Sequence, residues 1–311
     1  MTVSFSIKFP IEPFSIVKED TEILMIGSCF TEHIGNKLNN AGFKTTLNPF
    51  GILFNPISIS NAISRIVKEE LYKKSELHKN QEERFVSFDH HGRFSGNEPD
   101  IVIEEINSSL INAHKNLKSA DCIIITLGSA WVYKYLKKNS IVANCHKIPN
   151  KEFEKELLEI GTIVSSMNRA IDDLKSVNPN IKIVFTISPV KHLRDGIIEN
   201  QRSKATLILA IDALLKSSNR KLYYFPAYEI VTDELRDYRF FETDHAHPNQ
   251  LAIDYVWERF MESSFTTKAI EKAREAESIT KALAHKTLHS EMQNENLDKR
   301  IKEYIKKYPL S

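Results

Sequence analysis

The sequence predicts an α/β fold in which helices cover both faces of a mainly parallel sheet, and three observations support this. Short apolar runs have the length and composition of strands buried on both faces: 23–26, 122–127, 183–187 and 222–225. Stretches with helical spacing of apolar residues lie between or beside them: 32–40, 101–117, 153–177 and 201–215. Strands that alternate with helices need right-handed crossovers, which give parallel pairing. The expected architecture is a doubly wound, flavodoxin-like domain.

Two inserted segments are expected to form hairpins. One spans residues 84–94 around His91-Gly92, and the other spans residues 132–142 around the polar stretch 137–140. Ligands of open α/β sheets bind outside the carboxyl ends of the strands. Hairpins inserted at that edge would form the walls of a binding cleft.

The end of the chain has a different character from the rest. Residues 264–311 contain few aromatic side chains, many charges and apolar residues at helical spacing. This pattern predicts a pair of amphipathic helices with solvated charged faces. We therefore expect an α/β domain over residues 1–263 and a helical extension over 264–311, which packs on the domain or joins two copies of the chain in a homo-oligomer.

Composition excludes several classes of partner. The 311 residues are 41% hydrophobic and 27% charged, as in ordinary globular proteins, and the net charge is +1. Nucleic acids and anionic membranes attract clustered positive charge, so neither is an expected partner. An odd count of three cysteines argues against a disulfide framework. With no signal-peptide pattern or long apolar segment visible, the expected location is cytoplasmic.

A serine stands where a predicted strand meets a predicted helix. The strand 23–26 runs through Gly27 and Ser28 directly into the helical pattern. The first N–H groups of a helix lack partners and favour negative charge, so they can stabilise an oxyanion beside such a serine. The alternative is that Ser28 only caps the helix. Cys29 is either a second candidate nucleophile or a packed core residue.

A serine nucleophile needs a base, and the segment 244–249 offers one. Asp244 precedes His247 by three residues in a turn, so the carboxylate can orient the imidazole and stabilise its charged form. The alternatives are a polar surface turn and a metal site built from Asp244, His245 and His247. The chain has no HExxH motif and no clustered cysteines, so neither a metal nor a cofactor is expected.

These motifs resemble the GSCFA family, a branch of the SGNH (GDSL-like) hydrolase superfamily. The resemblance rests on Gly27-Ser28-Cys29-Phe30, on the Asp-x-x-His-Pro of 244–248, and on further blocks at 48–56, 126–133, 143–149, 188–196 and 233–240. It covers roughly residues 20 to 262. It implies a flavodoxin-like sheet, with Ser28 as nucleophile, His247 as base, Asp244 as orienting carboxylate and Gly51 as a backbone oxyanion donor.

The sequence departs from the superfamily pattern in two places. Thr31 stands where the family name has alanine. SGNH enzymes usually carry Gly-x-Asn after the third-block strand, whereas residues 128–130 read Gly-Ser-Ala. Asn144 or Asn48 could supply a replacement side-chain amide. The point matters because losing one oxyanion donor typically costs on the order of 100- to 1000-fold in turnover.

The predicted function is an SGNH-type serine esterase or acyltransferase that acts on an acyl ester of a small molecule or carbohydrate, including sugar O-deacetylation. His146, His192 and Arg194 lie at the expected cleft rim and are candidates for binding a polar or anionic substrate. The arginine equally fits a structural ion pair. Two other functions stay open: a non-catalytic carbohydrate- or metabolite-binding protein, and a metal-dependent hydrolase.

Overall fold

The central sheet is parallel and has the strand order β10-β9-β5-β1-β2. The computed structural model describes residues 7–216, 220–284 and 291–309. The strands of this sheet are β1 (Glu22–Gly27), β2 (Lys44–Leu47), β5 (Cys122–Leu127), β9 (Lys182–Ile187) and β10 (Leu222–Phe225). The order reverses between β1 and β5, as in flavodoxin-like folds, and such a switch point is the usual place for a ligand. The predicted doubly wound architecture is confirmed.

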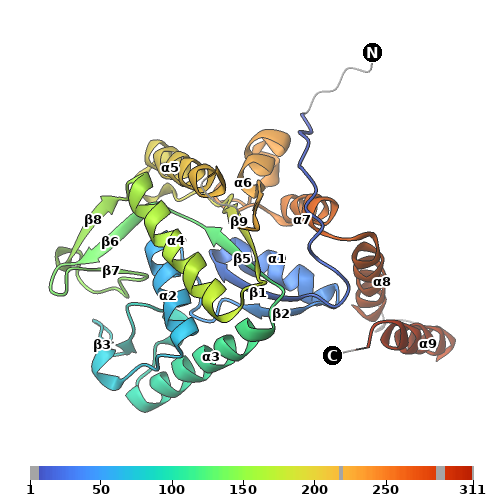
Figure 1. The fold of residues 1–311 in the computed structure, drawn as a ribbon, viewed down its shortest axis with the longest axis horizontal. Coiled ribbons are helices and arrows are strands. Elements are labelled where there is room, and N and C mark those ends of the chain that lie inside the picture. The colour runs from blue at the N-terminus through green and yellow to red at the C-terminus, as the bar shows by residue number, and fades with distance from the viewer. Residues whose placement is uncertain (1–6, 217–219, 285–290, 310–311) are drawn as a thin grey trace.

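Both faces of the sheet are buried. Along β1, Leu24 and Ile26 face one hydrophobic core, whereas Ile23 and Met25 face the other. The first core is covered by α2 (Pro56–Lys68), α3 (Pro99–Ser119), α4 (Ile160–Val177) and α5 (Ile197–Lys216). The second is covered by α1 (Cys29–Asn40), α7 (Gln250–Ser264) and α8 (Thr267–Ala284) (Figure 1).

A smaller antiparallel sheet lies beside the main one, at the far left of Figure 1. It consists of β6 (Trp131–Tyr135), β7 (Ser140–Val142) and β8 (Phe153–Leu157), with β6 in the middle. The hairpin predicted over 132–142 is therefore confirmed. The helix predicted over 153–177 is wrong in its first part, because residues 153–157 pair with β6 and the helix begins only at Ile160. Tertiary pairing overrides local helical spacing there.

The hairpin predicted over 84–94 is confirmed only as a single antiparallel bridge, between Phe85 and Gly96. The pairing of regular strands is instead between β3 (His78–Lys79) and β4 (Phe85–Val86). The turn lies at Asn80, whose Oδ1 accepts hydrogen bonds from the N–H groups of Glu82 and Arg84. Sequence analysis placed the turn at His91-Gly92, but an asparagine that binds its own following backbone is the stronger turn signal.

Two regular elements and several short ones were not predicted. β2 is a short polar strand at the sheet edge, and the serine-rich α2 follows the loop after it. The short turns are 74–76, 92–94, 150–152, 193–195 and 238–240 (3-10 helices), α6 (Ala227–Glu229), and the π-helical turn 230–235. Short and polar segments carry little hydrophobic periodicity, which explains why they escape pattern analysis.

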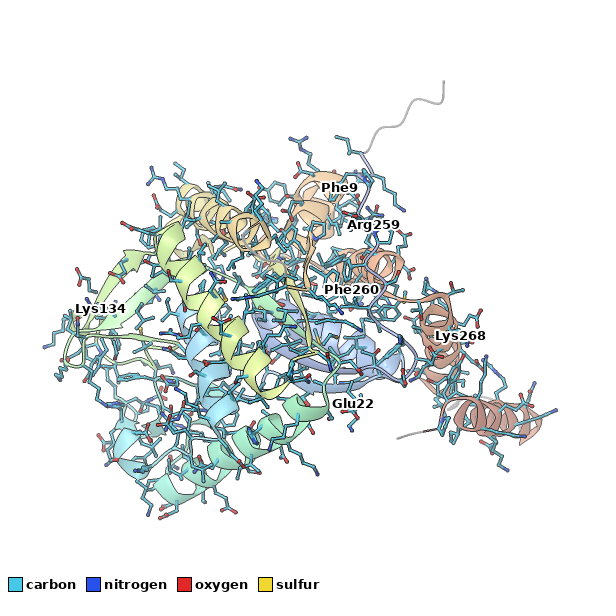
Figure 2. The ribbon with its side chains drawn as sticks, in the orientation of Figure 1. Phe9, Glu22, Lys134, Arg259, Phe260 and Lys268 are labelled. Carbon is cyan, nitrogen blue, oxygen red and sulfur yellow. The ribbon has the colours of Figure 1, made fainter. Side chains whose placement is uncertain are left out.

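The segment before β1 and helix α8 both contact α7, and the C-terminal helix packs on α8. The segment before β1 runs along α7, and Phe9 lies near Arg259 and Phe260 (Figure 2). α8 packs into the second core through Ala269 and Ala273, and α9 (Glu291–Lys307) contacts α8. The expected helical extension thus contributes to the core of the domain, and the boundary at residue 263 stays a prediction. Within the described ranges, no helix combines the length and apolar character needed to span a membrane.

Candidate active site

Ser28 lies at the carboxyl end of β1, at the N-cap position of α1, but its hydroxyl does not cap the helix. In contrast, Asn55 and Asn249 cap α2 and α7 by accepting N–H bonds from Ser58 and Ala252. The Ser28 residue is fully buried, and its Oγ has no hydrogen-bond partner among the described residues. Buried polar atoms are normally paired, so an unpaired hydroxyl here points to a role other than folding.

The turn that presents Ser28 depends on Gly27 and Asn48. Gly27 has a φ of 149°, and a Cβ at this position would lie 2.2 Å from the Thr126 carbonyl oxygen. Its N–H donates to Asn48 Oδ1 at 2.9 Å. The Asn48 side chain therefore holds this turn, with its Nδ2 3.5 Å from Glu32 Oε1. Because Asn48 is fully buried and committed to these contacts, its suggested use as an oxyanion donor would require them to break.

Asp244 and His247 form a hydrogen-bonded pair. Asp244 Oδ2 lies 2.5 Å from His247 Nδ1, and Asp244 Oδ1 accepts the N–H groups of Ala246 and His247. These bonds hold the pKa of the Asp244 carboxyl well below its ordinary value, the backbone N–H groups contributing most. The carboxylate thus stays charged. It favours a proton on Nδ1, which leaves Nε2 of the half-exposed imidazole as the basic nitrogen.

The loop that carries this pair is fastened to the end of β9. The N–H of Lys191 donates to the Ala246 carbonyl oxygen at 3.0 Å, and its ammonium reaches the carbonyl of His245 at 3.3 Å. The turn itself closes with an N–H of Glu242 that donates to the His247 carbonyl at 2.7 Å. His247 is therefore held at the carboxyl edge of the sheet, the edge at which Ser28 begins α1.

Electrostatic interactions link residues near the Ser28 turn with residues near the Asp244–His247 loop. The pKa of His192 is lowered to about 4, mainly by burial and in smaller part by the nearby Lys204 and His247. Lys204 in turn interacts with the thiol of Cys29, the residue after Ser28. Ser28, Lys204, His192 and His247 thus lie in one neighbourhood. No hydrogen bond joins Ser28 Oγ to His247 within the described part of the chain.

A cleft of about 450 Å³ opens beside this neighbourhood, between the small sheet and the loop after β9. Asn144, His192 and Arg194, all predicted from the sequence, line it. His192 also has a buried Nε2 without a partner in the described chain. Ser28 is not among the lining residues. The other lining residues are Ile52, Phe54, Asn55, Ser129, Trp131, Val132, Tyr133, Val142, Ala143, Cys145, Lys155, Lys191, Leu193 and Asp195.

Three other candidates have competing contacts. The N–H of Gly51 donates to the Asn48 carbonyl at 2.7 Å, so the predicted role of Gly51 as an oxyanion donor requires this bond to be exchanged. His146 is buried, and its Nε2 lies 2.7 Å from the Ser87 carbonyl oxygen, outside the lining of the cleft. Burial raises the pKa of the Cys29 thiol, which opposes its use as a nucleophile.

Sequence analysis did not single out Lys204, which is buried at the centre of this region. Its Nζ donates to the carbonyl oxygens of Gly128 and Ser188, each at 2.7 Å. A signal was present in the sequence. Lys204 falls on the same stripe of α5 as the buried Leu207 and Ile211, where an apolar residue is expected.

The described residues contain no group of three or more His, Cys, Asp or Glu side chains arranged to hold a metal ion. His245, the third member of the alternative metal set, has a φ of 56° and packs its ring edge-on against Tyr238. Only Asp244 and His247 of that set contact each other through their side chains.

Comparison with known proteins identifies the family of this chain. A comparison with curated proteins gave no match. Solved structures similar to this chain include a family two carbohydrate esterase from Clostridium thermocellum in complex with cellohexaose (12% identity, 82% of this chain, 65% of that chain, TM-score 0.37), an acetyl esterase mutant with acetate ion (9%, 82%, 99%, 0.39), and a carbohydrate esterase family 3 protein from Talaromyces cellulolyticus (9%, 82%, 99%, 0.33). The GSCFA family profile matches residues 22–260, and the chain therefore belongs to the GSCFA family.

Proposed function

We propose that this protein is a serine hydrolase of the esterase type, with Ser28 as nucleophile, His247 as general base and Asp244 as the carboxylate that orients it. The observation that carries the proposal is the Ser28 hydroxyl, which is buried at a strand-to-helix turn and makes no capping bond. The Asp244–His247 pair on the same edge of the sheet supplies the base.

The chemistry follows from the roles of these groups. As Ser28 Oγ bonds to the acyl carbon of an ester, its proton passes to His247 Nε2. The alcohol then leaves with that proton, and the acyl group stays on Ser28. A water molecule or an acceptor hydroxyl then gives a proton to His247 as its oxygen bonds to the acyl carbon. His247 passes that proton to Ser28 Oγ as the Ser28–acyl bond breaks, which releases the acid or a new ester. The first N–H groups of α1 lie beside the developing oxyanion.

The cleft favours a polar alcohol portion in the substrate. Asn144, Lys155 and Arg194 supply hydrogen-bond donors to it, and Tyr133 and Trp131 supply aromatic surface. This combination suits an acylated sugar or a similar polar ester. Release of acetate from acetylated sugars, compared with hydrolysis of short-chain p-nitrophenyl esters, tests this part of the proposal.

Serine labelling tests the mechanism without knowledge of the substrate. A fluorophosphonate probe is expected to label the wild type and Ser166→Ala, but not Ser28→Ala. Ser166 is the matched control because its Oγ, on α4, is also buried without a partner in the described chain. Equal labelling of wild type and Ser28→Ala would remove the assignment of the nucleophile. An unlabelled wild type that still binds acylated sugars would favour a non-catalytic binding protein.

A further inference from the structure

Lys204 is a buried cation without a buried anion beside it. The residue is 1% exposed, and the hydrogen-bond partners of its Nζ in the described chain are main-chain carbonyls and not carboxylates. Two main-chain carbonyls, at Gly128 and Ser188, accept two of the three ammonium hydrogens. No described hydrogen bond uses the third. A buried charge is normally paired with an opposite charge, so this arrangement calls for an explanation.

The strand register places the ammonium near Ser28. Gly27 of β1 pairs with Thr126 of β5, and Thr126 pairs with Thr186 of β9. Ser28 therefore lies just past the end of β1, while Gly128 and Ser188 lie just past the ends of the next two strands. Neighbouring strands are about 4.8 Å apart. The Lys204 ammonium is held between the carbonyls of Gly128 and Ser188. It is therefore within about two strand spacings of Ser28.

Other contacts show that α5 is built to hold polar groups at this edge. One helical turn before Lys204, Asn200 Oδ1 accepts the N–H of His192 at 2.9 Å, and the Asn200 Nδ2 is buried without a partner in the described chain. Ser203 Oγ accepts the N–H of Ala130 at 2.7 Å. This helix face therefore fixes the segment 128–130, which lacks the asparagine of the usual Gly-x-Asn element.

We propose, building on the proposed function, that Lys204 is a further catalytic residue whose ammonium stabilises the oxyanion formed on the acyl group bonded to Ser28, in place of the absent Gly-x-Asn amide. The third ammonium hydrogen is the donor. A full positive charge in a water-excluded site interacts strongly with a developing negative charge. The two carbonyls hold the ammonium before substrate arrives, so little reorganisation accompanies the reaction.

The proposal has a pH signature. Burial lowers the pKa of Lys204 to about 7. The titratable groups that face it are the Cys29 thiol of α1, His192 of the loop after β9, and Tyr228 of α6, whose ring centroid is 5.7 Å from Nζ. Because the charged form is the active one, the reaction should slow as pH rises above about 7. If Lys204 instead removed the Ser28 proton, the rate would rise over that range.

The test is the rate constant with which a fluorophosphonate probe labels Ser28. The phosphoryl oxygen of the probe gains negative charge as Ser28 attacks its phosphorus. Lys204→Met should slow labelling by on the order of 100- to 1000-fold. Lys175→Met is the matched control, because Lys175 Nζ also donates to two main-chain carbonyls, of Pro179 and Ile181, but at the opposite end of β9. This control should label within about twofold of wild type, a bound set by its distance from the oxyanion.

The outcomes separate the two proposals. A wild type that is not labelled overturns the proposed function and this inference with it. A wild type labelled at Ser28, with a folded Lys204→Met labelled at the same rate, overturns only the role of Lys204. If Lys204→Met does not fold, the wild-type pH profile decides: a labelling rate that falls between pH 7 and 9 supports the role, and a rate that is flat or rising over that interval overturns it. A purely structural lysine would produce no such fall.

Discussion

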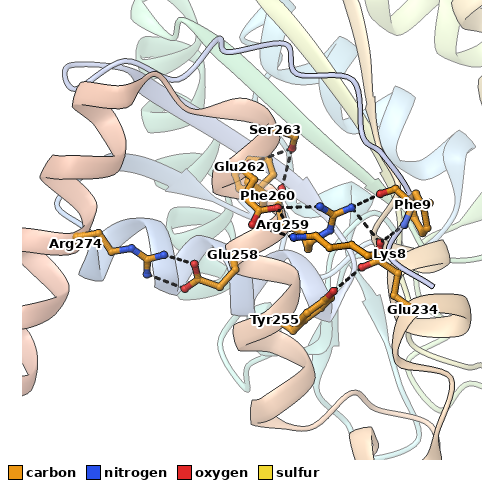
Figure 3. A network of polar contacts seen from close by, with 10 residues as sticks. All are labelled: Lys8, Phe9, Glu234, Tyr255, Glu258, Arg259, Phe260, Glu262, Ser263 and Arg274. Carbon is orange, nitrogen blue, oxygen red and sulfur yellow. Dashed lines mark hydrogen bonds and ion pairs between the residues drawn. The ribbon is translucent and has the colours of Figure 1, made fainter. Parts of the chain in front are cut away.

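Two of the buried cations in the described chain, Arg259 and Lys204, are held in opposite ways. Arg259 on α7 lies in a network with a carboxylate: its Nη2 is 3.0 Å from Glu234 Oε1 and also donates to the Phe9 carbonyl (Figure 3). Tyr255 donates to the other Glu234 oxygen at 2.8 Å. Lys204, by contrast, has only main-chain carbonyls as described hydrogen-bond partners.

The difference separates structure from function. The Arg259 network balances charge and ties the segment before β1 to α7, so it serves the fold. In that network Arg259 Nε is buried without a partner in the described chain. On the Lys204 side three different side chains are left incomplete in this way: Ser28 Oγ, His192 Nε2 and Asn200 Nδ2. Folding alone would select against such groups, because each unpaired polar atom costs free energy. Ser28 follows β1, whereas His192 follows β9 and contacts Asn200, so all three lie toward the carboxyl edge of the sheet, where the proposed reaction would take place.

The largest expected effect is the loss of activity when the exposed carboxylate of Asp244 is replaced. In Asp244→Asn, the amide N–H₂ can donate to His247 Nδ1, which forces the proton onto Nε2 and blocks acceptance of the Ser28 proton. The rate of Ser28 labelling should fall by about 10⁴-fold, as in other serine triads, while the urea unfolding midpoint changes little. The control is Asp254→Asn, which removes another exposed carboxylate, paired with Lys37. A loss of less than tenfold would contradict the orienting role.

The next effect is on stability, in the network of Figure 3. Arg259→Met leaves the Glu234 carboxylate, whose side chain is 1% exposed, without its counter-charge. We expect a loss of about 3–5 kcal/mol in the free energy of unfolding, measured by urea denaturation. Arg274→Met removes the half-exposed pair with Glu258 in the same figure and should cost about 0–1 kcal/mol. Equal losses in the two variants would mean that burial does not determine how much an ion pair contributes to the free energy of unfolding.

The sequence specified the fold more fully than the site. Continuous apolar runs located β1, β5, β9 and β10, because strands buried on both faces need such runs. The motif residues Ser28 and His247 could be named because each stands in a recognisable local pattern. Lys204 only interrupts the apolar stripe of α5, a signal that marks it as unusual but names no role. Its importance depends on Gly128 and Ser188, which only the parallel pairing of two strands brings to it.

A third effect concerns the pH dependence of stability. Folding lowers the pKa of Lys204 from its ordinary 10.5 to about 7, so between these values the unfolded chain binds more protons. The free energy of unfolding contributed by this group should therefore rise with pH from about 7 to 10.5, by at most about 1.4 kcal/mol per pH unit. Urea denaturation of wild type and Lys204→Met at pH 7, 8 and 9 isolates this slope as their difference. A difference that stays constant with pH would show that folding does not lower the pKa of Lys204.

The smallest expected effect is the most diagnostic of Ser28. Because its hydroxyl is buried and makes no hydrogen bond to the described residues, Ser28→Ala should leave the free energy of unfolding unchanged or raise it by up to about 1 kcal/mol. Asn249→Ala removes a side chain that does cap its helix and should lower it by about 0.5–2 kcal/mol. Urea denaturation compares the two. If Ser28→Ala were destabilised as much as Asn249→Ala, Ser28 would be a structural helix cap. The contrast between the unpaired polar groups near Lys204 and the Arg259 network would then no longer apply to Ser28.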